Sequence, residues 1–268
     1  MEQLLQKAQA YHRAVSAHDT GLVAAMIRPD YIQHNSRVPT GSGPFLAFLE
    51  KLKEHDTRIQ NVRIFQDERF VVMHHLWRNA IPFGAQETVA FHIIRFDDAG
   101  LIAEHWNVMT DVTPPNPSLR TLIDGESRVS ASAHTANNKA KTVELYQRLI
   151  GAQSSECGAI WREFFLADFK QHHPRVADGI AGLELALRTG AVDRRLRRQH
   201  KVLGSGNFVL SIAEGTERGV PTAFYDLFRW EEGLIVEHWP VYQEIPTVGV
   251  ANTNTMFNFE PTARSERA

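Results

Sequence analysis

The sequence predicts an α+β fold, made of two tandem domains that each place helices before an antiparallel sheet. Two observations indicate this. Segments recur in the same order in both halves of the 268-residue chain: YIQHNSRVPTG at 31–41 returns as FKQHHPRVADG at 169–179, and GLIAEHWNV at 100–108 returns as GLIVEHWPV at 233–241. Within each half, helical periodicity gives way to strand-length apolar runs, an order typical of α+β proteins rather than parallel α/β sheets.

A third match joins AFHIIRF (90–96) to AFYDLFRW (223–230), and it aligns Arg95 with Arg229. Ordered matches at a nearly constant spacing indicate a tandem duplication with units of ordinary domain size. Residues 113–141 are rich in Pro, Ser, Asn and Ala and lack apolar periodicity, which is typical of a tail followed by a linker. We therefore expect domain 1 at 1–130, a linker at 131–138 and domain 2 at 139–260.

The elements of the first domain follow from periodicity. Residues 2–15, 18–29 and 43–55 predict three helices, the second capped by Asp19 or Thr20. Four strands are then expected from runs rich in β-branched and aromatic residues, at 58–68, 70–79, 87–96 and 101–109. Glycines at 100 and 233 are suited to the hairpin turns DDAGL and EEGL because they tolerate positive φ.

Composition limits the partners. A hydrophobic content of 43%, a charged content of 22% and a net charge of −2 are typical of a soluble protein, and they disfavour nucleic acid or an anionic membrane as partners. No run approaches the roughly 18 apolar residues of a membrane span, and the N-terminus lacks a signal-peptide core, so we expect a cytoplasmic protein. The single cysteine, Cys157, excludes an intramolecular disulfide and predicts a semi-buried free thiol.

The combination of a Y/F-x-Q-H-x corner, an x-D-x-F-R strand and a G-x-I-x-E-H-W strand resembles the SnoaL-like family of the nuclear-transport-factor-2-like superfamily. The tails at 114–125 and 245–257 resemble closing segments of that superfamily. The resemblance implies cone-shaped domains with an apolar cavity, a fold that hosts cyclases, isomerases, epoxide hydrolases and non-enzymatic binders. By the family's pattern, Asp226 would move a proton beside a carbonyl, whereas the first repeat has His92 at that position.

The candidate catalytic residues each have a structural alternative. Asp226 shares a strand face with two phenylalanines, so it is either a catalytic carboxylate or an aspartate paired with an arginine or histidine. His92, on an apolar face, is either a general base or a satisfied core histidine. His34 and His172, in the repeated corner, either bind a substrate oxygen at the cavity rim or lock the corner. Further substrate-contact candidates are Tyr31, His75, His105, Tyr225, His238 and Trp239.

Other chemistry has less support in the sequence. Three histidines from separate segments (His34, His75 and His92) would suffice for a divalent metal site, but no local metal motif accompanies them. Dinucleotide, P-loop and nucleophile-elbow motifs are absent from the sequence. The basic run 193–201 is read as a solvated face.

We therefore predict a SnoaL-like enzyme without an organic cofactor, in which general acid/base chemistry isomerises or cyclises a small apolar carbonyl compound. The alternatives are a non-catalytic binding or structural protein of the same fold, and a metal-dependent enzyme that uses the first-domain histidines. The expected partner is a small apolar organic ligand. By analogy with superfamily dimers, we expect the two domains to form an intramolecular pseudo-dimer, with a homodimer of chains as a further option.

Overall fold

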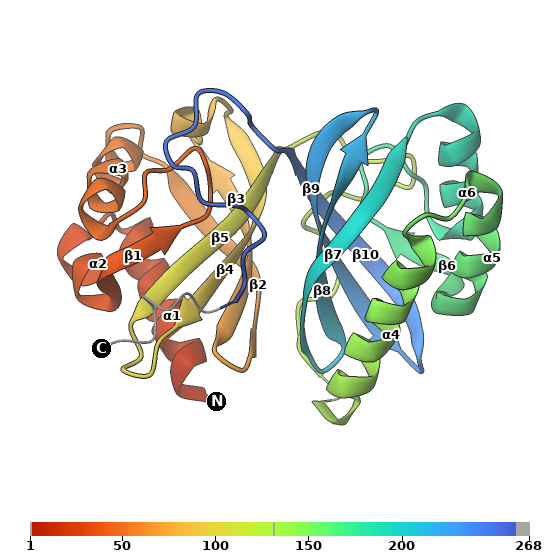
Figure 1. Ribbon diagram of the computed structural model, residues 1–268, viewed down its shortest axis with the longest axis horizontal. Coiled ribbons are helices and arrows are strands. Elements are labelled where there is room, and N and C mark those ends of the chain that lie inside the picture. Colours follow the sequence, from red (N-terminus) through yellow and green to blue (C-terminus); the bar gives the residue numbers. More distant parts are fainter. Residues whose placement is uncertain (1, 131, 261–268) are drawn as a thin grey trace. The chain divides into compact units, whose positions relative to one another are not determined.

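The computed structural model describes residues 2–130 and 132–260. Its contacts divide the chain into two compact units: unit 1 comprises Met1–Asp111 and Pro246–Ala268, and unit 2 comprises Val112–Ile245. In each unit the helices cover one face of a five-stranded sheet (Figure 1). The predicted α+β class with two tandem domains is confirmed.

Unit 1 follows the predicted helices and strands closely. Its elements are α1 (Glu2–Ser16), α2 (Thr20–Met26), β1 (Ile27–Gln33), α3 (Ser42–Glu54), β2 (Arg58–Asp67), β3 (Phe70–Arg78), the 3-10 turn η1 (Ile81–Phe83), β4 (Glu87–Phe96) and β5 (Ile102–Asp111). Helix α1 buries Ala8, Tyr11 and Val15, which recur at helical spacing. Asp19 caps α2 by accepting a hydrogen bond from the Leu22 amide at 2.9 Å.

The sheet order β1-β5-β4-β3-β2 contains the predicted antiparallel meander β2 to β5. It also contains a strand that the sequence did not predict. Residues 27–29, expected at the end of a helix, belong to β1, which runs parallel to β5 and pairs Gln33 with His105. The strand forms because its partner lies about 70 residues away along the chain, so local periodicity gives no sign of it.

Unit 2 repeats this topology with the order β6-β10-β9-β8-β7. Its elements are η2 (Ser132–His134), α4 (Thr135–Leu149), α5 (Ser154–Phe164), β6 (Phe165–Gln171), α6 (Gly179–Thr189), β7 (Arg194–Ser205), β8 (Phe208–Glu217), β9 (Val220–Glu231) and β10 (Leu234–Glu244). The basic run forms the start of β7. Because α4 begins at Thr135, the second half of the predicted linker is helical, and the buried Asn138 donates to the Gly206 carbonyl at 3.0 Å.

Each repeat's tail belongs to the other unit. Residues 112–130 follow β5 of the first repeat but pack within unit 2, and residues 246–260 follow β10 of the second repeat but pack within unit 1 (Figure 1). The predicted domains at 1–130 and 139–260 follow sequence order and therefore describe the repeats. The compact units differ from the repeats by this exchange of tails.

A buried carboxylate organises the corner of unit 2. Glu237 accepts hydrogen bonds from Arg229 Nε at 2.9 Å and from His172 Nε2 at 2.9 Å. His172 Nδ1 contacts the Thr121 carbonyl, in the exchanged tail, at 2.6 Å. Both ring nitrogens of His172 are thus engaged by oxygen atoms, one from Glu237 and one from the tail. The His172 ring stacks on Trp239 with ring centroids 4.8 Å apart.

Unit 1 has the same arrangement of a buried glutamate, an arginine and a corner histidine, which we call the corner clamp in both units. Glu104 accepts from Arg95 and from His34 Nε2, the latter at 2.8 Å. His34 Nδ1 donates to the Thr255 carbonyl of the other exchanged tail at 2.7 Å, and the ring stacks on Trp106 at 4.4 Å. The repetition of the corner histidine is therefore explained by a structural role, because it joins the sheet to a tail.

Asparagine side chains complete the attachment of the tails. In unit 1, Asn252 Nδ2 donates to the carbonyls of Asn35 and Val38 at 2.8 and 2.7 Å. These carbonyls belong to the corner loop, whose residues have no sheet partner for them. The Asn35 carbonyl also accepts from the Val38 amide at 3.1 Å, so the tail adds to the hydrogen bonds that the corner loop makes within itself.

A substitution at Gly125 would test how closely the tail of unit 2 packs against Glu237 of the corner clamp. It has φ +91°, and an added Cβ would lie 2.0 Å from Glu237 Oε1. Gly151 is a matched control, because its φ is +83° and nothing lies within 4 Å of an added Cβ. We expect Gly151→Ala to cost about 1–2 kcal/mol through backbone strain, and Gly125→Ala to cost about 1–3 kcal/mol more through the clash, as measured by urea unfolding. Equal costs would contradict the close contact.

Candidate functional site

Unit 2 contains a cavity of about 370 Å³ between its helices and its sheet. Apolar side chains from α4, α5, α6 and β9 form much of the wall, among them Leu145, Trp161, Leu183, Phe224 and Phe228. The volume lies within the roughly 300–1,000 Å³ of small-molecule sites. The first requirement for a binding site, an apolar space with polar groups at one place, is met in this unit.

Asp226 on β9 is the centre of the polar wall and is buried to 1% exposure. Its Oδ1 accepts from Arg194 Nη1 and His238 Nε2, both at 2.9 Å, and its Oδ2 accepts from Tyr146 Oη and Arg194 Nη2, both at 2.5 Å. Four donors saturate the carboxylate. Burial alone would raise the pKa of Asp226, but the charge of Arg194 and the hydrogen bonds from His238 and Arg194 hold it well below its ordinary value.

A hydrogen-bond relay sets the tautomer of His238. The His173 amide donates to Gln171 Oε1 at 2.9 Å, so the other end of that amide group, Nε2, donates to His238 Nδ1 at 3.1 Å. His238 therefore carries its proton on Nε2, which faces Asp226. Burial lowers the pKa of His238 even though Asp226 favours its charged form, so the ring is neutral near pH 7.

His173 is a second neutral imidazole in the cavity wall. Its Nδ1 accepts from the Arg175 amide at 3.1 Å, and its ring stacks on Tyr242 with centroids 5.6 Å apart. Burial, together with the charge of Arg175, lowers the pKa of His173 to about 3. With Nδ1 accepting, Nε2 carries the proton, so His173 is a hydrogen-bond donor that stays uncharged at physiological pH.

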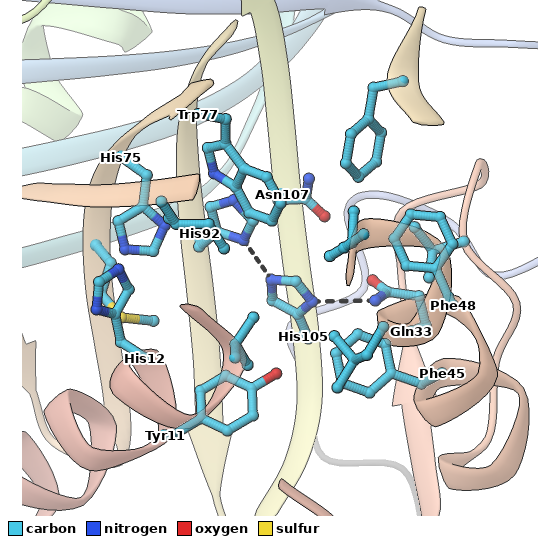
Figure 2. A pocket seen from close by; sticks show the side chains of 17 residues that line it. Tyr11, His12, Gln33, Phe45, Phe48, His75, Trp77, His92, His105 and Asn107 are labelled. Atoms are coloured by element: carbon cyan, nitrogen blue, oxygen red, sulfur yellow. Dashed lines mark hydrogen bonds between the residues drawn. The ribbon is translucent and has the colours of Figure 1, made fainter. Parts of the chain in front are cut away.

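The corresponding space in unit 1 is almost filled. Its cavity measures about 40 Å³ and is lined by histidines and aromatic side chains (Figure 2). Strand pairing explains this difference in cavity volume. His92 occupies the position equivalent to Asp226, so the strands paired with each, β3 and β8, can be compared residue by residue. Larger side chains in β3 replace small ones in β8: Met73, His75 and Trp77 correspond to Ser211, Ala213 and Gly215.

The same hydrogen-bond relay is present in unit 1. The Asn35 amide donates to Gln33 Oε1 at 2.9 Å, and Gln33 Nε2 donates to His105 Nδ1 at 3.0 Å. His105 Nε2 then donates to His92 Nδ1 at 2.8 Å, as the dashed lines of Figure 2 show. His92 thus accepts the hydrogen bond that Asp226 accepts in unit 2, and it keeps its own proton on Nε2.

Four imidazoles of unit 1 form an uncharged cluster in which one pair of rings is stacked and two pairs are tilted. Ring centroids lie 4.6 Å apart for His12 and His75, 4.8 Å for His75 and His92, and 5.0 Å for His92 and His105. Burial, aided by neighbouring histidines, holds the pKa of His75 and His92 well below the ordinary value and lowers that of His105 to about 3. The cluster packs as a core of neutral rings.

The structure does not support the predicted metal alternative of His34, His75 and His92. Within residues 2–130 and 132–260, no group of three or more His, Cys, Asp or Glu side chains is placed to hold a metal ion. Both nitrogens of His34 are engaged by Glu104 and Thr255, and the relay leaves a proton rather than a lone pair on His92 Nε2.

The other predicted site residues divide between the two cavities and the surrounding core. Asp226 and His238 line the cavity of unit 2, and His75, His92 and His105 line that of unit 1. Five predicted residues line neither cavity: Tyr31, His34, His172, Tyr225 and Trp239.

These five have identifiable structural positions. His34 and His172, predicted as catalytic rim groups, have both ring nitrogens engaged in the corner clamps, and Trp239 packs on one of them. Tyr225 points to the opposite sheet face from its neighbour Asp226, because side chains alternate along a strand. Tyr31 lies in the core, where its hydroxyl accepts from Gln33 Nε2 at 3.0 Å.

Three residues of the unit 2 site were not predicted: Tyr146, His173 and Arg194. Arg194 was assigned to a solvated basic face, but it starts β7 and its guanidinium lies 4.0 Å over the Phe224 ring. Tyr146 had a sequence signal, because it aligns with Tyr11 in the repeated first helix. His173 was visible as the second histidine of the corner, but no pattern indicated which of the two faces the cavity.

Comparison with known proteins agrees with this architecture. Residues 8–105 match the SnoaL-like domain family. The first repeat is a SnoaL-like domain. Unit 2 repeats its motifs and its topology, so the chain is a tandem of two domains with the same fold. No curated protein matches the chain.

Solved structures similar to this chain cover about two fifths of it. IdmH from Streptomyces antibioticus, to which a polyketide cyclase activity is ascribed, is 19% identical over 40% of this chain and 91% of its own, with a TM-score of 0.34. An epoxide hydrolase of M. tuberculosis is 14% identical over 41% of this chain and 84% of its own, with a TM-score of 0.34. TsrD from Streptomyces laurentii is 18% identical over 40% and 86%, with a TM-score of 0.32.

No helix in the described part of the chain is both long and apolar enough to cross a membrane.

The neutral histidine cluster predicts that unit 1 is sensitive to acid. A buried imidazole with a lowered pKa binds fewer protons folded than unfolded, so its stabilisation is present above the unfolded pKa of about 6.5 and is lost as the pH falls below it. Each of His75, His92 and His105 then lowers the free energy of unfolding by about 1.4 kcal/mol for each pH unit below that value. We expect hydrogen exchange, corrected for intrinsic rates, to lose protection in β4 and β5 between pH 7.5 and 5.0 before β9 and β10. Equal protection at pH 5.0 would contradict this.

Proposed function

We propose that unit 2 is a small-molecule enzyme that uses acid/base chemistry to isomerise a small apolar carbonyl compound or to close it by an aldol-type reaction. The observation that carries the proposal is the Asp226 cluster in the wall of a 370 Å³ apolar cavity. One carboxylate there is surrounded by donors that are suited to an oxygen on which negative charge develops. Unit 1, with its filled cavity, has a structural role in this proposal.

The proton acceptor in the proposed reaction is Asp226. Because its four lone-pair sites are occupied, one donor has to leave before a proton can be accepted. Tyr146 is that donor: its hydroxyl turns from Asp226 Oδ2 to the carbonyl oxygen of the substrate. The same movement frees the base and supplies a hydrogen bond to the oxygen.

The proton balance is then simple. The α C–H bond breaks, its proton passes to Asp226 Oδ2, and the electron pair forms an enolate held by Tyr146 and Arg194. Return of the proton to a different carbon gives an isomer. Attack of the enolate on a second carbonyl forms a C–C bond, and the new alkoxide takes the proton from Asp226. His238 keeps Asp226 in position throughout, through Oδ1.

A second candidate function is binding of a small molecule without turnover. It is favoured by the saturation of Asp226 and by the depression of its pKa, because a carboxylate with strong donors is a weak base. The cavity would then select ligands that offer acceptors to Arg194 and His173. The two candidates differ in α-proton exchange, which only the enzyme catalyses.

Asp226→Asn separates the candidates, with 2-tetralone as an apolar ketone probe in D₂O and NMR detection of α-deuteration. We expect the wild type to catalyse exchange and Asp226→Asn to lose it by about 10²–10⁴-fold. The exchange rate of the wild type is expected to show no limb from Asp226 between pH 5 and 8, because its pKa lies far below that window. Exchange that survives in Asp226→Asn would rule out Asp226 as the base.

The folding of that variant needs its own control. Asp226→Asn leaves the mostly buried Arg194 charge without its partner, at an expected cost of about 3–5 kcal/mol. The double variant Asp226→Asn/Arg194→Met removes both charges and is expected to recover stability in urea unfolding without recovering exchange. Binding without turnover predicts no exchange in the wild type, with 2-tetralone still protecting Cys157, which lines the cavity, from N-ethylmaleimide.

A further inference from the structure

The last residue of β6 and the corner that follows it provide three residues that line the unit 2 cavity: Gln171, His173 and Val176. The backbone carbonyls of all three lie within hydrogen-bond distance of one side-chain nitrogen, Asn116 Nδ2. The distances are 2.6 Å to Gln171, 2.9 Å to Val176 and 3.4 Å to His173. Asn116 is 2% exposed and comes from the tail of the first repeat.

The orientation of the Asn116 amide is fixed. Its Oδ1 accepts from the backbone amides of Ser118 and Arg120 at 2.9 and 3.0 Å, within the tail itself. Oxygen therefore faces the tail and nitrogen faces the corner, which is the only orientation that provides donors for the carbonyls. An aspartate of the same shape has no proton to offer them.

Two further contacts attach the tail to the far end of the corner. Arg120 forms a bidentate ion pair with Asp178, with its closest contact at 2.7 Å, and Ser118 Oγ accepts from the Asp178 amide at 2.9 Å. Asp178 Oδ1 in turn accepts from the Gln171 amide at 3.0 Å. The tail thus holds both ends of the segment on which the cavity residues stand.

These contacts connect directly to the relay. The position of the His173 amide fixes the Gln171 side chain, which fixes the tautomer of His238 and so the donor that faces Asp226. A displaced corner would change the direction of each hydrogen bond in this series.

We propose that residues 112–125, contributed by the first repeat, are a working part of the second repeat's site, and that Asn116 is the positioning residue that holds His173 and Gln171 against the cavity. The second repeat alone is then an incomplete site. The proposal rests on the proposed function for its turnover readout only, because the state of His173 and the accessibility of Cys157 report on the cavity without turnover.

The test uses the full-length chain with Asn116→Asp, and Asn252→Asp as the matched control in unit 1. Asn252 makes the equivalent contacts to Asn35 and Val38, so both exchanges remove the same kind of donor. Three readouts apply to each protein: an ¹⁵N NMR titration of His173, protection of Cys157 from N-ethylmaleimide by 2-tetralone, and kcat and KM for α-deuteration of 2-tetralone.

In the wild type we expect His173 to remain neutral down to about pH 4, because its pKa is about 3. Asn116→Asp is expected to move that titration toward the ordinary value of about 6.5, to reduce protection of Cys157 about 10-fold, and to lower kcat/KM by about 10- to 100-fold. Asn252→Asp is expected to leave all three within about twofold, because its contacts lie in unit 1.

Arg120→Gln is the milder second variant, and it removes the ion pair to the partly exposed Asp178. If Asn116→Asp does not fold, Arg120→Gln is expected to change the three readouts in the same direction, with roughly threefold effects on Cys157 protection and on kcat/KM. The proposal is overturned if a folded Asn116→Asp, or Arg120→Gln in its place, leaves the titration of His173 and the protection of Cys157 unchanged. It is also overturned if Asn252→Asp changes them equally. A wild type without exchange overturns the proposed function alone, since the other two readouts still decide this proposal.

Discussion

The buried glutamate between an arginine and a corner histidine is the interaction on which each unit depends. A fully buried carboxylate is costly unless charged and hydrogen-bonding groups surround it, and here an arginine and a histidine do so. In unit 2 the three side chains come from β9, β10 and the corner, so their hydrogen bonds fix the relative position of these segments. The histidine's second nitrogen then requires an acceptor, which the exchanged tail supplies.

Once the clamp is in place, the next polar layer follows from it. The parallel pairing of β6 with β10 places Gln171 beside His238, and that of β1 with β5 places Gln33 beside His105. The same relay is therefore built in both units, and only its final acceptor differs. An aspartate there binds an arginine and a tyrosine in the wall of a cavity, whereas a histidine there joins a stack of neutral rings. The two units thus share the clamp and the relay, whereas the side chains that fill their interiors differ.

The sequence predicted the parts of the molecule that local periodicity and internal repetition record. The helices and the antiparallel meander were recovered because their partners are sequence neighbours. Strand β1 and the tail exchange were not, because both depend on contacts between segments more than 50 residues apart. Alternation correctly placed Asp226 on an inward face, but Arg194 looked like one of several exposed arginines. Its burial depends on Asp226 and Phe224, which lie about 30 residues further along.

Xenon binding in crystals of the full-length protein would show whether the two interiors differ, with an open cavity in unit 2 and a filled one in unit 1. Xenon occupies apolar cavities without requiring any particular chemistry. We expect xenon in unit 2, against the wall that includes Leu145 and Phe228, and none beside His75 and Trp77 in unit 1. Xenon in unit 1 at comparable occupancy, or an empty unit 2, would mean that the two interiors do not differ in this way.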